Sequence, residues 1–366
     1  MSAAVDIHQQ GPTPGARGAQ KDPGQKNPGQ GLARTNARRA LGWLLLLAVL
    51  AGLVVASLLV GTTGIPLSTI WEAMVHFDPG QSIHHSIRDE RLARTLLGVL
   101  VGMSLAVAGA LIQAMTRNPL ADPGILGVNA GAAFFVALAM GLFGLTGIWA
   151  NIWFAFLGAI VATVVVYAIG SRGVTGATPI RLTLAGVAVG ALLTGITTGL
   201  VLLEPATFEQ MRFWSAGSIG GRGQQVPLAI LPFIALGIVL AASVAGSLNA
   251  VALGDDLARA LGADVVRTRV VGVVAVTLLC GAATAAAGPI GFVGLMIPHL
   301  CRWLVGPEQR WIFAYSLVAG PILLLGSDIV GRLLLRPTGL QVGIVTAFLG
   351  APVLIAFVRR SKASGL

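Results

Sequence analysis

The sequence predicts an all-α protein that crosses a membrane about ten times. Hydrophobic residues make up 55% of the 366 residues and charged residues only 10%, whereas a typical soluble domain carries about 25% charged residues. The mean hydropathy is +0.84, so the chain has too little polar surface to enclose its apolar residues in water. The apolar residues gather in ten stretches, and polar or helix-breaking residues separate one stretch from the next.

Residues 1–40 are predicted to form a disordered cytoplasmic tail. The part over 11–31 contains six Gly and four Pro and no large apolar side chain, so it cannot bury enough surface to offset its ordering entropy. The first span, 41–61, follows Arg34, Arg38 and Arg39 and is long enough to cross a bilayer, which favours a retained span. A cleaved signal peptide is the alternative.

Nine further stretches complete a transmembrane domain predicted over 41–361, and residues 362–366 form a short cytoplasmic tail. Prolines and glycines interrupt the chain at Asn118-Pro119, at 122–124, at 173–179 and at Gly288-Pro289. The break at Gly288-Pro289 leaves it open whether the seventh and eighth stretches form a re-entrant pair. The nine stretches are 91–115, 125–143, 151–170, 181–203, 227–247, 269–287, 290–304, 311–331 and 342–358.

The distribution of charge predicts the orientation of these spans. If the N-terminus is cytoplasmic, 17 of the 24 Lys and Arg residues lie inside and 7 lie outside, as the positive-inside rule requires. Both termini are then cytoplasmic, and the protein is expected in the cytoplasmic (inner) cell membrane. Several tryptophans lie at predicted span ends, where amphipathic rings favour headgroup depth; they are Trp43, Trp149, Trp153, Trp303 and Trp311.

Two spans carry small residues at intervals of four. One series is Gly98, Gly102, Ala106 and Ala110, and the other is Gly186, Gly190, Thr194 and Thr198. Small residues at this spacing let helices approach closely in lipid, where packing drives helix association. Tight packing within the subunit is the favoured interpretation, and a stripe lining a pathway or a dimer interface is the alternative.

The sequence excludes several kinds of chemistry on this chain. None of the three lysines, Lys21, Lys26 and Lys362, follows a glycine, so a phosphate-binding Gly-Lys-Ser/Thr loop is absent. No His-Glu-x-x-His or Gly-x-Ser-x-Gly motif occurs, so neither catalytic residues nor a bound metal or cofactor is expected. The span centres hold almost no charge, which disfavours ion-driven transport. ATP-driven transport would therefore need a separate ATPase chain.

Individual histidines and cysteines have ordinary structural interpretations. Cys280 and Cys301 fall in apolar runs and are expected to be reduced and buried. His299 follows Pro298, where satisfaction by backbone carbonyls is favoured over a proton relay. His84 and His85 are adjacent, so their side chains diverge and make a poor metal site.

The loop over 249–268 contains a short amphipathic segment. Acidic residues at its start favour the positive end of a helix dipole, and a glycine at its end can adopt the left-handed conformation. Leu257 and Leu261, four residues apart, give the helix one apolar face. Such a face in an aqueous loop docks either on a partner or back on its own subunit. The segment comprises Gly254, Asp255, Asp256, Leu257, Ala258, Arg259, Ala260, Leu261 and Gly262.

Several long blocks of the sequence resemble the FecCD-type permeases, the BtuC-like subunits of type II ABC importers. The resemblance covers residue 41 to the end of the chain and is strongest to the ferric-enterobactin branch, although Leu340-Gln341-Val342 replaces a Glu-Leu-Pro-like sequence found in many relatives. It therefore implies a ferric siderophore as cargo, in general rather than enterobactin in particular. The matching residues are Arg91 to Arg94, Gly109, Gln113, Arg117 to Gly124, Leu126, Gly127, Gly254 to Gly262, Gly288 to Leu295, Pro298 to Arg302, Asp328 to Arg332 and Val342 to Ile344.

This resemblance implies partners and roles for named residues. The family's permease pairs with a second permease, here expected to be a different chain, with an identical chain as the alternative. Its other partners are two ATPase subunits that bind ATP and Mg, a substrate-binding protein and the lipid bilayer. Nucleic acid is not a partner. Residues 254–262 match the helix that couples the permease to its ATPase. Arg91, Arg94 and Arg332 match arginines that dock the binding protein, with exposed ion pairs that steer more than hold; lipid-headgroup anchoring is the alternative.

The same resemblance places an inner gate between the fourth and fifth spans, at Ala177, Thr178, Pro179 and Ile180. A plain turn is the alternative for this segment. Haem or cobalamin remains an alternative cargo within the importer class. A proton-coupled secondary transporter and a structural membrane scaffold are the competing functions from other classes.

Overall fold

The computed structural model describes residues 35–61, 64–145, 147–172, 178–203, 205–336 and 338–363, and every regular element within these ranges is helical. Two short elements, η1 and η2, are a π-helix and a 3₁₀-helix. In chain order the elements are α1 (Asn36–Leu59), α2 (Leu67–Val75), α3 (Ser82–His85), η1 (Ser86–Leu92), α4 (Ala93–Thr116), η2 (Pro123–Leu126), α5 (Val128–Gly141), α6 (Ile148–Gly170), α7 (Pro179–Leu203), α8 (Pro205–Ser215), α9 (Gln225–Val251), α10 (Asp255–Ala260), α11 (Val265–Ala287), α12 (Val293–Val305), α13 (Gln309–Leu334) and α14 (Val342–Ala363).

Ten of these helices correspond in order to the ten predicted apolar stretches. In the part of the chain that is described, seven helices are long and apolar enough to cross a membrane. Three shorter apolar helices, over 128–141, 293–305 and 342–356, take the remaining positions. The prediction of an all-α, multi-pass membrane protein with about ten spans is therefore confirmed.

The break at Gly288-Pro289 separates two helices of unequal length. Gly288 and Phe292 both have positive φ, at 74° and 67°, and turn the chain between α11 and α12. α11 has 23 residues, whereas α12 has 13 and is only about 20 Å long at about 1.5 Å per residue. Gly294, at the start of α12, packs against Leu105 and Gly109 in α4. A full-length span is thus followed by a half-length helix that begins inside the bundle.

α4 is the centre of the larger helix group and packs against α9, α11, α12 and α13. Its glycines allow this packing: a Cβ at Gly102 would lie 2.7 Å from the backbone of Pro321 in α13, and one at Gly109 would collide with Gly294. Ala106 and Ala110 are completely buried. The stripe of small residues in α4 is therefore used for packing within the subunit, as favoured by the sequence.

The second stripe, in α7, packs only at its beginning. A side chain at Gly186 would collide with the carbonyl of Ile125, but the space around Gly190 is almost open. Thr198 is exposed, and only 17% of the apolar window of α7 is buried within the chain. This face of α7 is consequently available to a neighbour or a pathway.

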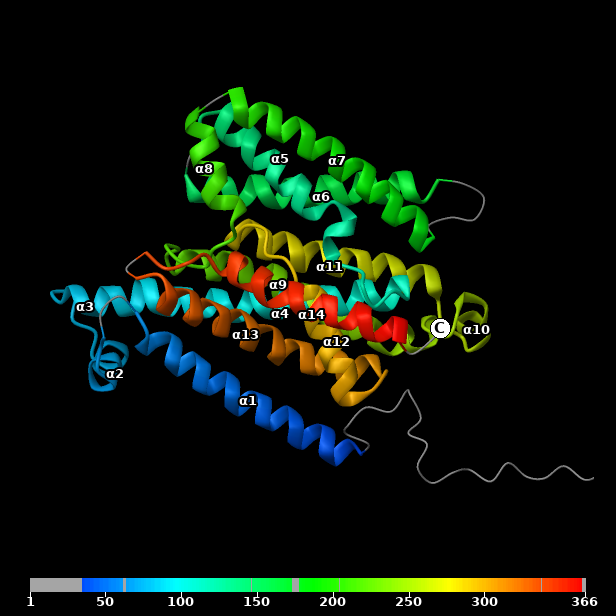
Figure 1. Ribbon diagram of the computed structural model, residues 1–366, viewed down its shortest axis with the longest axis horizontal. Helices are drawn as coiled ribbons and strands as arrows, with labels where there is room; N and C mark the ends of the chain where they lie inside the picture. The colour runs from blue at the N-terminus through cyan, green and yellow to red at the C-terminus, as the bar shows by residue number, and fades with distance from the viewer. Residues whose placement is uncertain are drawn as a thin grey trace, which may run out of the picture.

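The helices form two groups that lie side by side (Figure 1). α5, α6, α7 and α8 form one group, and α11 connects it to the group around α4 through contacts with α5 and α6. α1 lies at the edge, packed mainly against α13. α2 and α3 lie at one end of the molecule, called the α2 end below, and α10 lies at the opposite end, called the α10 end (Figure 1).

The first and the last helix each extend beyond the predicted span toward the terminus of the chain. α1 begins at Asn36, five residues before the predicted first span, because Thr35 accepts a hydrogen bond from the backbone N–H of Arg38 at 3.3 Å and caps the helix. α14 extends to Ala363, into the predicted C-terminal tail. Residues 1–34 and 364–366 lie outside the described residues. Cys280 and Cys301 are buried free thiols, as predicted.

Candidate functional site

A buried carboxylate organises the α2 end of the bundle. Asp328, on α13, is 1% exposed and receives two hydrogen bonds at 3.1 Å from Nε of Arg94 and one at 2.7 Å from its Nη2. Arg332, one turn further along α13, forms a second ion pair with Asp328 at 3.0 Å. Bidentate charge-assisted bonds of this kind fix geometry as well as charge. The ion pairs therefore hold the start of α4 against the end of α13.

Arginines also cap the end of α1. The last four carbonyl groups of an α-helix have no donor within the helix, and cations are favoured at this end of the helix dipole. Arg91 donates to two of these carbonyls, at 2.8 and 3.1 Å, and Arg332 donates to the other two, one of them at 2.9 Å. The four carbonyls belong to Ser57, Leu58, Leu59 and Val60. We call Arg91, Arg94, Asp328 and Arg332 the arginine cluster.

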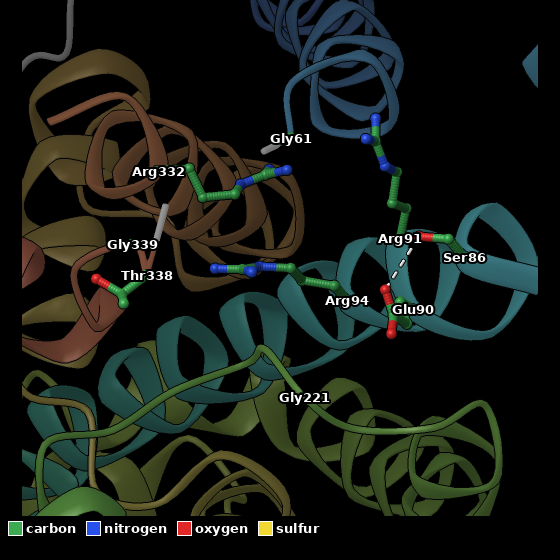
Figure 2. Close-up of a pocket in the computed structure, with 9 residues that line it drawn as sticks. All are labelled: Gly61, Ser86, Glu90, Arg91, Arg94, Gly221, Arg332, Thr338 and Gly339. Carbon is green, nitrogen blue, oxygen red and sulfur yellow. Dashed lines mark hydrogen bonds between the residues drawn. The ribbon is translucent and has the colours of Figure 1, made fainter. Parts of the chain in front are cut away.

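The arginine cluster borders a cavity of about 250 Å³ (Figure 2). Arg91 points toward the end of α1 and Arg94 points toward α13, while Glu90 accepts a hydrogen bond from Ser86 at 3.0 Å. Three guanidinium groups against the carboxylates of Asp328 and Glu90 leave one positive charge at the cavity. The lining residues are Gly61, Ser86, Glu90, Arg91, Arg94, Gly221, Arg332, Thr338 and Gly339.

The three predicted docking arginines are thus brought together, but they are more buried than the sequence suggested. We expected exposed ion pairs; Arg91 is 8% exposed, and the side chains of Arg332 and Arg94 are 8% and 25% exposed. The expectation was wrong because the sequence does not reveal that Arg91 and Arg332 cap α1. The docking role itself stays a prediction, and Arg94 presents the most accessible side chain of the three for it.

The predicted coupling segment forms a short helix at the α10 end. α10 begins with Asp255 and Asp256, and Gly262 has φ of 82°, so the predicted start and end of the helix are confirmed. Ala258 is completely buried in a small apolar cluster with Val251 and Val265. One face of α10 therefore packs on its own subunit.

The two leucines of the coupling segment, in contrast to Ala258, lie at the surface. Leu257 is 49% exposed and Leu261 is 62% exposed. Packing of Ala258 on the subunit leaves these two larger side chains at the surface, so the chain itself does not cover the apolar face of the coupling segment. An exposed apolar pair of this kind is typical of an interaction surface.

Asp255 connects α10 to two long helices. It receives hydrogen bonds from Nη2 of Arg269, in α11, at 3.0 and 2.9 Å. Nη2 of Arg117, at the end of α4, approaches Asp255 at 3.3 Å. Asp256, in contrast, is fully exposed and pairs only within α10, with Arg259 at 3.2 Å. Asp255 therefore joins α10 to α11 and to the end of α4.

Arg117 adopts an unusual backbone conformation for this contact. It follows the last residue of α4 with φ of 53°, in the left-handed region, which costs an L-residue with a side chain about 1–2 kcal/mol. Glycine is the usual residue at this position of a helix end. An arginine here turns the chain as glycine would and also supplies the guanidinium group that meets Asp255.

A buried polar network links α4 to the half-length helix α12. Gln113 is 2% exposed, and its amide nitrogen donates to the carbonyls of Gly294 and Leu295 at 3.2 and 3.0 Å. Arg302 donates to its side-chain oxygen at 2.7 Å. Gln113 thereby fixes the position at which α12 begins beside α4.

The predicted inner gate lies at the start of α7. Ala177 is outside the described residues. Thr178 precedes the helix and its hydroxyl oxygen accepts a 3.4 Å hydrogen bond from the N–H of Arg181; Pro179 is the first helical residue, a common helix start. Ile180 is 73% exposed. The local structure is an ordinary helix N-terminus, and its role as a gate stays a prediction.

Sequence reasoning did not identify the roles of Asp328, Asp255 and Arg269 as ion-pair partners. A signal for one of these pairs was present, since Asp328 and Arg332 are four residues apart on a helix, where opposite charges meet. The pairs of Arg94 with Asp328 and of Arg117 with Asp255 join residues 234 and 138 positions apart. Only the folded chain reveals them.

Known proteins match the chain over nearly its whole length. The FecCD transport family matches residues 46–360. The ferric enterobactin transport system permease protein FepD of Escherichia coli (strain K12) is 47% identical over 335 residues, which cover 91% of this chain and 98% of FepD. The "Probable siderophore transport system permease protein YfiZ" of Bacillus subtilis (strain 168) is 39% identical over 87% of this chain and 96% of its own length.

A solved structure has the same architecture. The inward-facing conformation of a metal-chelate type ABC transporter superposes with a TM-score of 0.76 and 27% sequence identity. The match covers 88% of this chain and 99% of that chain. The overall arrangement of the helices is therefore shared with that transporter.

Proposed function

The chain belongs to the FecCD transport family, and from this premise we propose that it moves a ferric siderophore across the inner membrane as the permease subunit of an ATP-driven ABC importer. It is a transport subunit, not an enzyme. The siderophore cargo is supported by the names of its relatives, which are permeases for ferric enterobactin and for siderophores. Haem or cobalamin is the alternative cargo.

The exposed apolar face of α10 is the observation that carries the ATP-driven mechanism. Leu257 and Leu261 lie 49% and 62% exposed on a helix that is otherwise held by Ala258 and Asp255. A small, firmly attached helix with an uncovered apolar pair suits docking into a groove on another protein. We assign that groove to an ATPase subunit, which holds ATP and Mg because this chain has no phosphate-binding loop.

The charge distribution sets the proposed orientation. The positive-inside rule places the α10 end and both termini in the cytoplasm, so two ATPase subunits bind at that end. The arginine cluster then faces outward, toward a substrate-binding protein that carries acidic groups. A second permease, in our proposal a different chain, completes the pathway along exposed surfaces such as that of α7.

The geometry suggests how ATP drives the pathway. ATP binding closes the ATPase pair and displaces α10 through Leu257 and Leu261. Asp255 transfers this displacement to Arg117 and Arg269, and hence to α4 and α11. Because α4 also carries Arg94 at its other end, the two ends of the pathway respond together, as alternating access requires.

The test of coupling replaces Leu257, in α10, and Leu261, directly after it, by aspartate in the assembled complex. L257D/L261D should abolish cargo-stimulated ATP hydrolysis and uptake in proteoliposomes, because two charges cannot enter an apolar groove without desolvation. Leu120→Asp is the matched control, since Leu120 is 46% exposed in another loop; it should retain both activities. Unchanged ATP hydrolysis by L257D/L261D would refute the coupling role.

A second measurement distinguishes the cargoes and the energy source. Proteoliposomes containing the complex should take up a ferric catecholate siderophore with ATP and without a pH gradient. Preferential uptake of haem or cobalamin would change the cargo. Uptake by this chain alone, driven by a pH gradient, would replace the ABC mechanism with secondary transport.

A further inference from the structure

The helix α2 exposes an apolar surface that neither the spans nor the arginine cluster uses. Four of its nine residues are apolar and exposed. Their exposed fractions are 60% for Leu67, 71% for Trp71, 39% for Met74 and 52% for Val75. At about 100° per residue these side chains lie within one continuous sector of the helix. We call these four residues the apolar sector. A surface of this composition on a protein exterior marks an interaction site.

The remaining residues of α2 divide into two further sectors. Ile70 and Ala73 are buried, in a small core with Ile65 and Ile87. Ser68 and Glu72 are exposed and lie on the other flank of the apolar sector. Around the helix axis, the surface therefore changes from core to exposed apolar to exposed polar. A helix lying flat in a membrane interface, with one side on its own protein, needs this order.

The depth of α2 follows from its contacts with α1. Leu58 and Leu59, at the end of α1, pack against the same small core as Ile70 and Ala73. The apolar part of α1 from Leu41 to Leu59 covers about 28 Å at about 1.5 Å per residue, close to the thickness of the hydrocarbon core. The end of α1 therefore lies at the membrane boundary, and α2 lies at the same depth.

The guanidinium groups of Arg91 and Arg332 mark this boundary independently. Both donate to carbonyls at the end of α1, and guanidinium groups are expected at headgroup depth rather than in hydrocarbon. Tryptophan favours the same depth, and Trp71 is the most exposed residue of the apolar sector.

The apolar sector is adjacent to the exposed apolar surface of α1, which as a membrane span faces lipid. α1 is a strongly apolar span of which only 6% is buried within the chain, and Leu41, Leu44, Leu45, Val49 and Val55 are all exposed along it. α2 contacts α1 directly. Polar groups suited to a protein partner gather instead at the cavity of the arginine cluster. Lipid is therefore the occupant that this surface fits.

We propose that α2 is an interfacial anchor, with Leu67, Trp71, Met74 and Val75 inserted among the lipids at the α2 end and Ser68 and Glu72 facing water. By holding the end of α1 at a fixed depth, it also fixes the carbonyls that Arg91 and Arg332 bind. This inference rests on the chain spanning a bilayer and not on its cargo or its ATPase.

Spin labels placed one at a time on α2 test the proposal in the full-length chain in lipid nanodiscs. The native thiols are removed by Cys280→Ala and Cys301→Ala, and cysteines replace Leu67, Trp71 or Val75. The matched controls carry Ser68→Cys or Glu72→Cys. The collision rates with oxygen, which partitions into lipid, and with a water-soluble nickel chelate give the depth of each label.

Labels in the apolar sector should lie about 5–10 Å deeper than the phosphate groups, the depth of interfacial helices, while both control labels should remain accessible to nickel. Equal nickel accessibility at all five positions would overturn the proposal. The proposal would also be overturned if adding a substrate-binding protein made the labels inaccessible to oxygen. In that case α2 would be a protein-docking surface.

A second measurement uses the chain with its cysteines intact, in case the double cysteine variant does not fold. Brominated lipids quench tryptophan fluorescence on contact. Trp71→Phe should remove part of the quenchable fluorescence of the wild-type chain, which contains seven tryptophans. An unchanged quenched fraction would contradict insertion of Trp71 into lipid. Neither readout requires transport. Failure of the anchor proposal is therefore distinguishable from failure of the proposed transport function.

Discussion

The two ends of α4 carry the same chemical unit in different surroundings. At the α2 end, Asp328 is shared by Arg94 and Arg332, and at the α10 end, Asp255 is shared by Arg117 and Arg269. The carboxylate of Asp328 is 1% exposed, whereas that of Asp255 is 26% exposed. Each unit includes one arginine from α4 or its end.

This difference in burial changes how much each carboxylate contributes to stability. A buried carboxylate cannot exchange its arginines for water without a large desolvation penalty. A partly exposed carboxylate can do so at modest cost, because water replaces the lost partner. We therefore expect loss of the carboxylate to destabilise the fold more at the α2 end than at the α10 end.

The largest expected effect is from Asp328→Asn. Two arginines would keep their positions in the bundle without the carboxylate, which costs about 3–5 kcal/mol for a buried pair. Denaturant unfolding in mixed micelles measures this change. The matched control Asp255→Asn should lose much less, and equal losses would show that burial does not distinguish the two units.

A smaller effect is expected from the backbone of Arg117. Arg117→Ala and Arg117→Gly both remove the ion pair to Asp255, but only glycine relieves the left-handed strain. The glycine variant should be more stable than the alanine variant by about 1 kcal/mol, since left-handed residues other than glycine cost about 1–2 kcal/mol. Unfolding of both variants under identical conditions gives the difference. Equal stability would mean that the strain is absent.

The smallest effect on stability is expected for Asp255→Asn. Partly exposed ion pairs contribute about 0–1 kcal/mol, so unfolding should change little. Transport per ATP hydrolysed in proteoliposomes should nevertheless fall, because α10 is no longer held to α4 and α11. Asp256→Asn is the matched control, since Asp256 is fully exposed, and should behave as wild type. Normal coupling in Asp255→Asn would contradict its role as the connection.

Features with a strong local cause could be predicted from the sequence. All ten apolar stretches became helices at the expected places, and the limits of α10 followed from its acidic start and from Gly262. The stripe from Gly98 to Ala110 was correctly predicted to pack within the subunit. Each of these patterns depends on residues close together in the chain.

Features produced by distant residues were missed. The burial of Arg91 and Arg332 results from the exposed carbonyls of α1, which no sequence pattern reveals. α2 was not predicted because nine residues make a weak helical signal. The early start of α1 is a local error: the arginines before Leu41 were interpreted as tail, although Thr35 is a good helix cap.

Site-specific photocrosslinking from α10 tests the central claim most directly. A photoreactive amino acid at Leu257 or Leu261 in the assembled importer should crosslink to the ATPase subunit, and one at Leu44, exposed in α1, should not. Mass spectrometry identifies the attached chain. Crosslinks to the ATPase from both leucines are the predicted result, and crosslinks only within the permease would contradict the account.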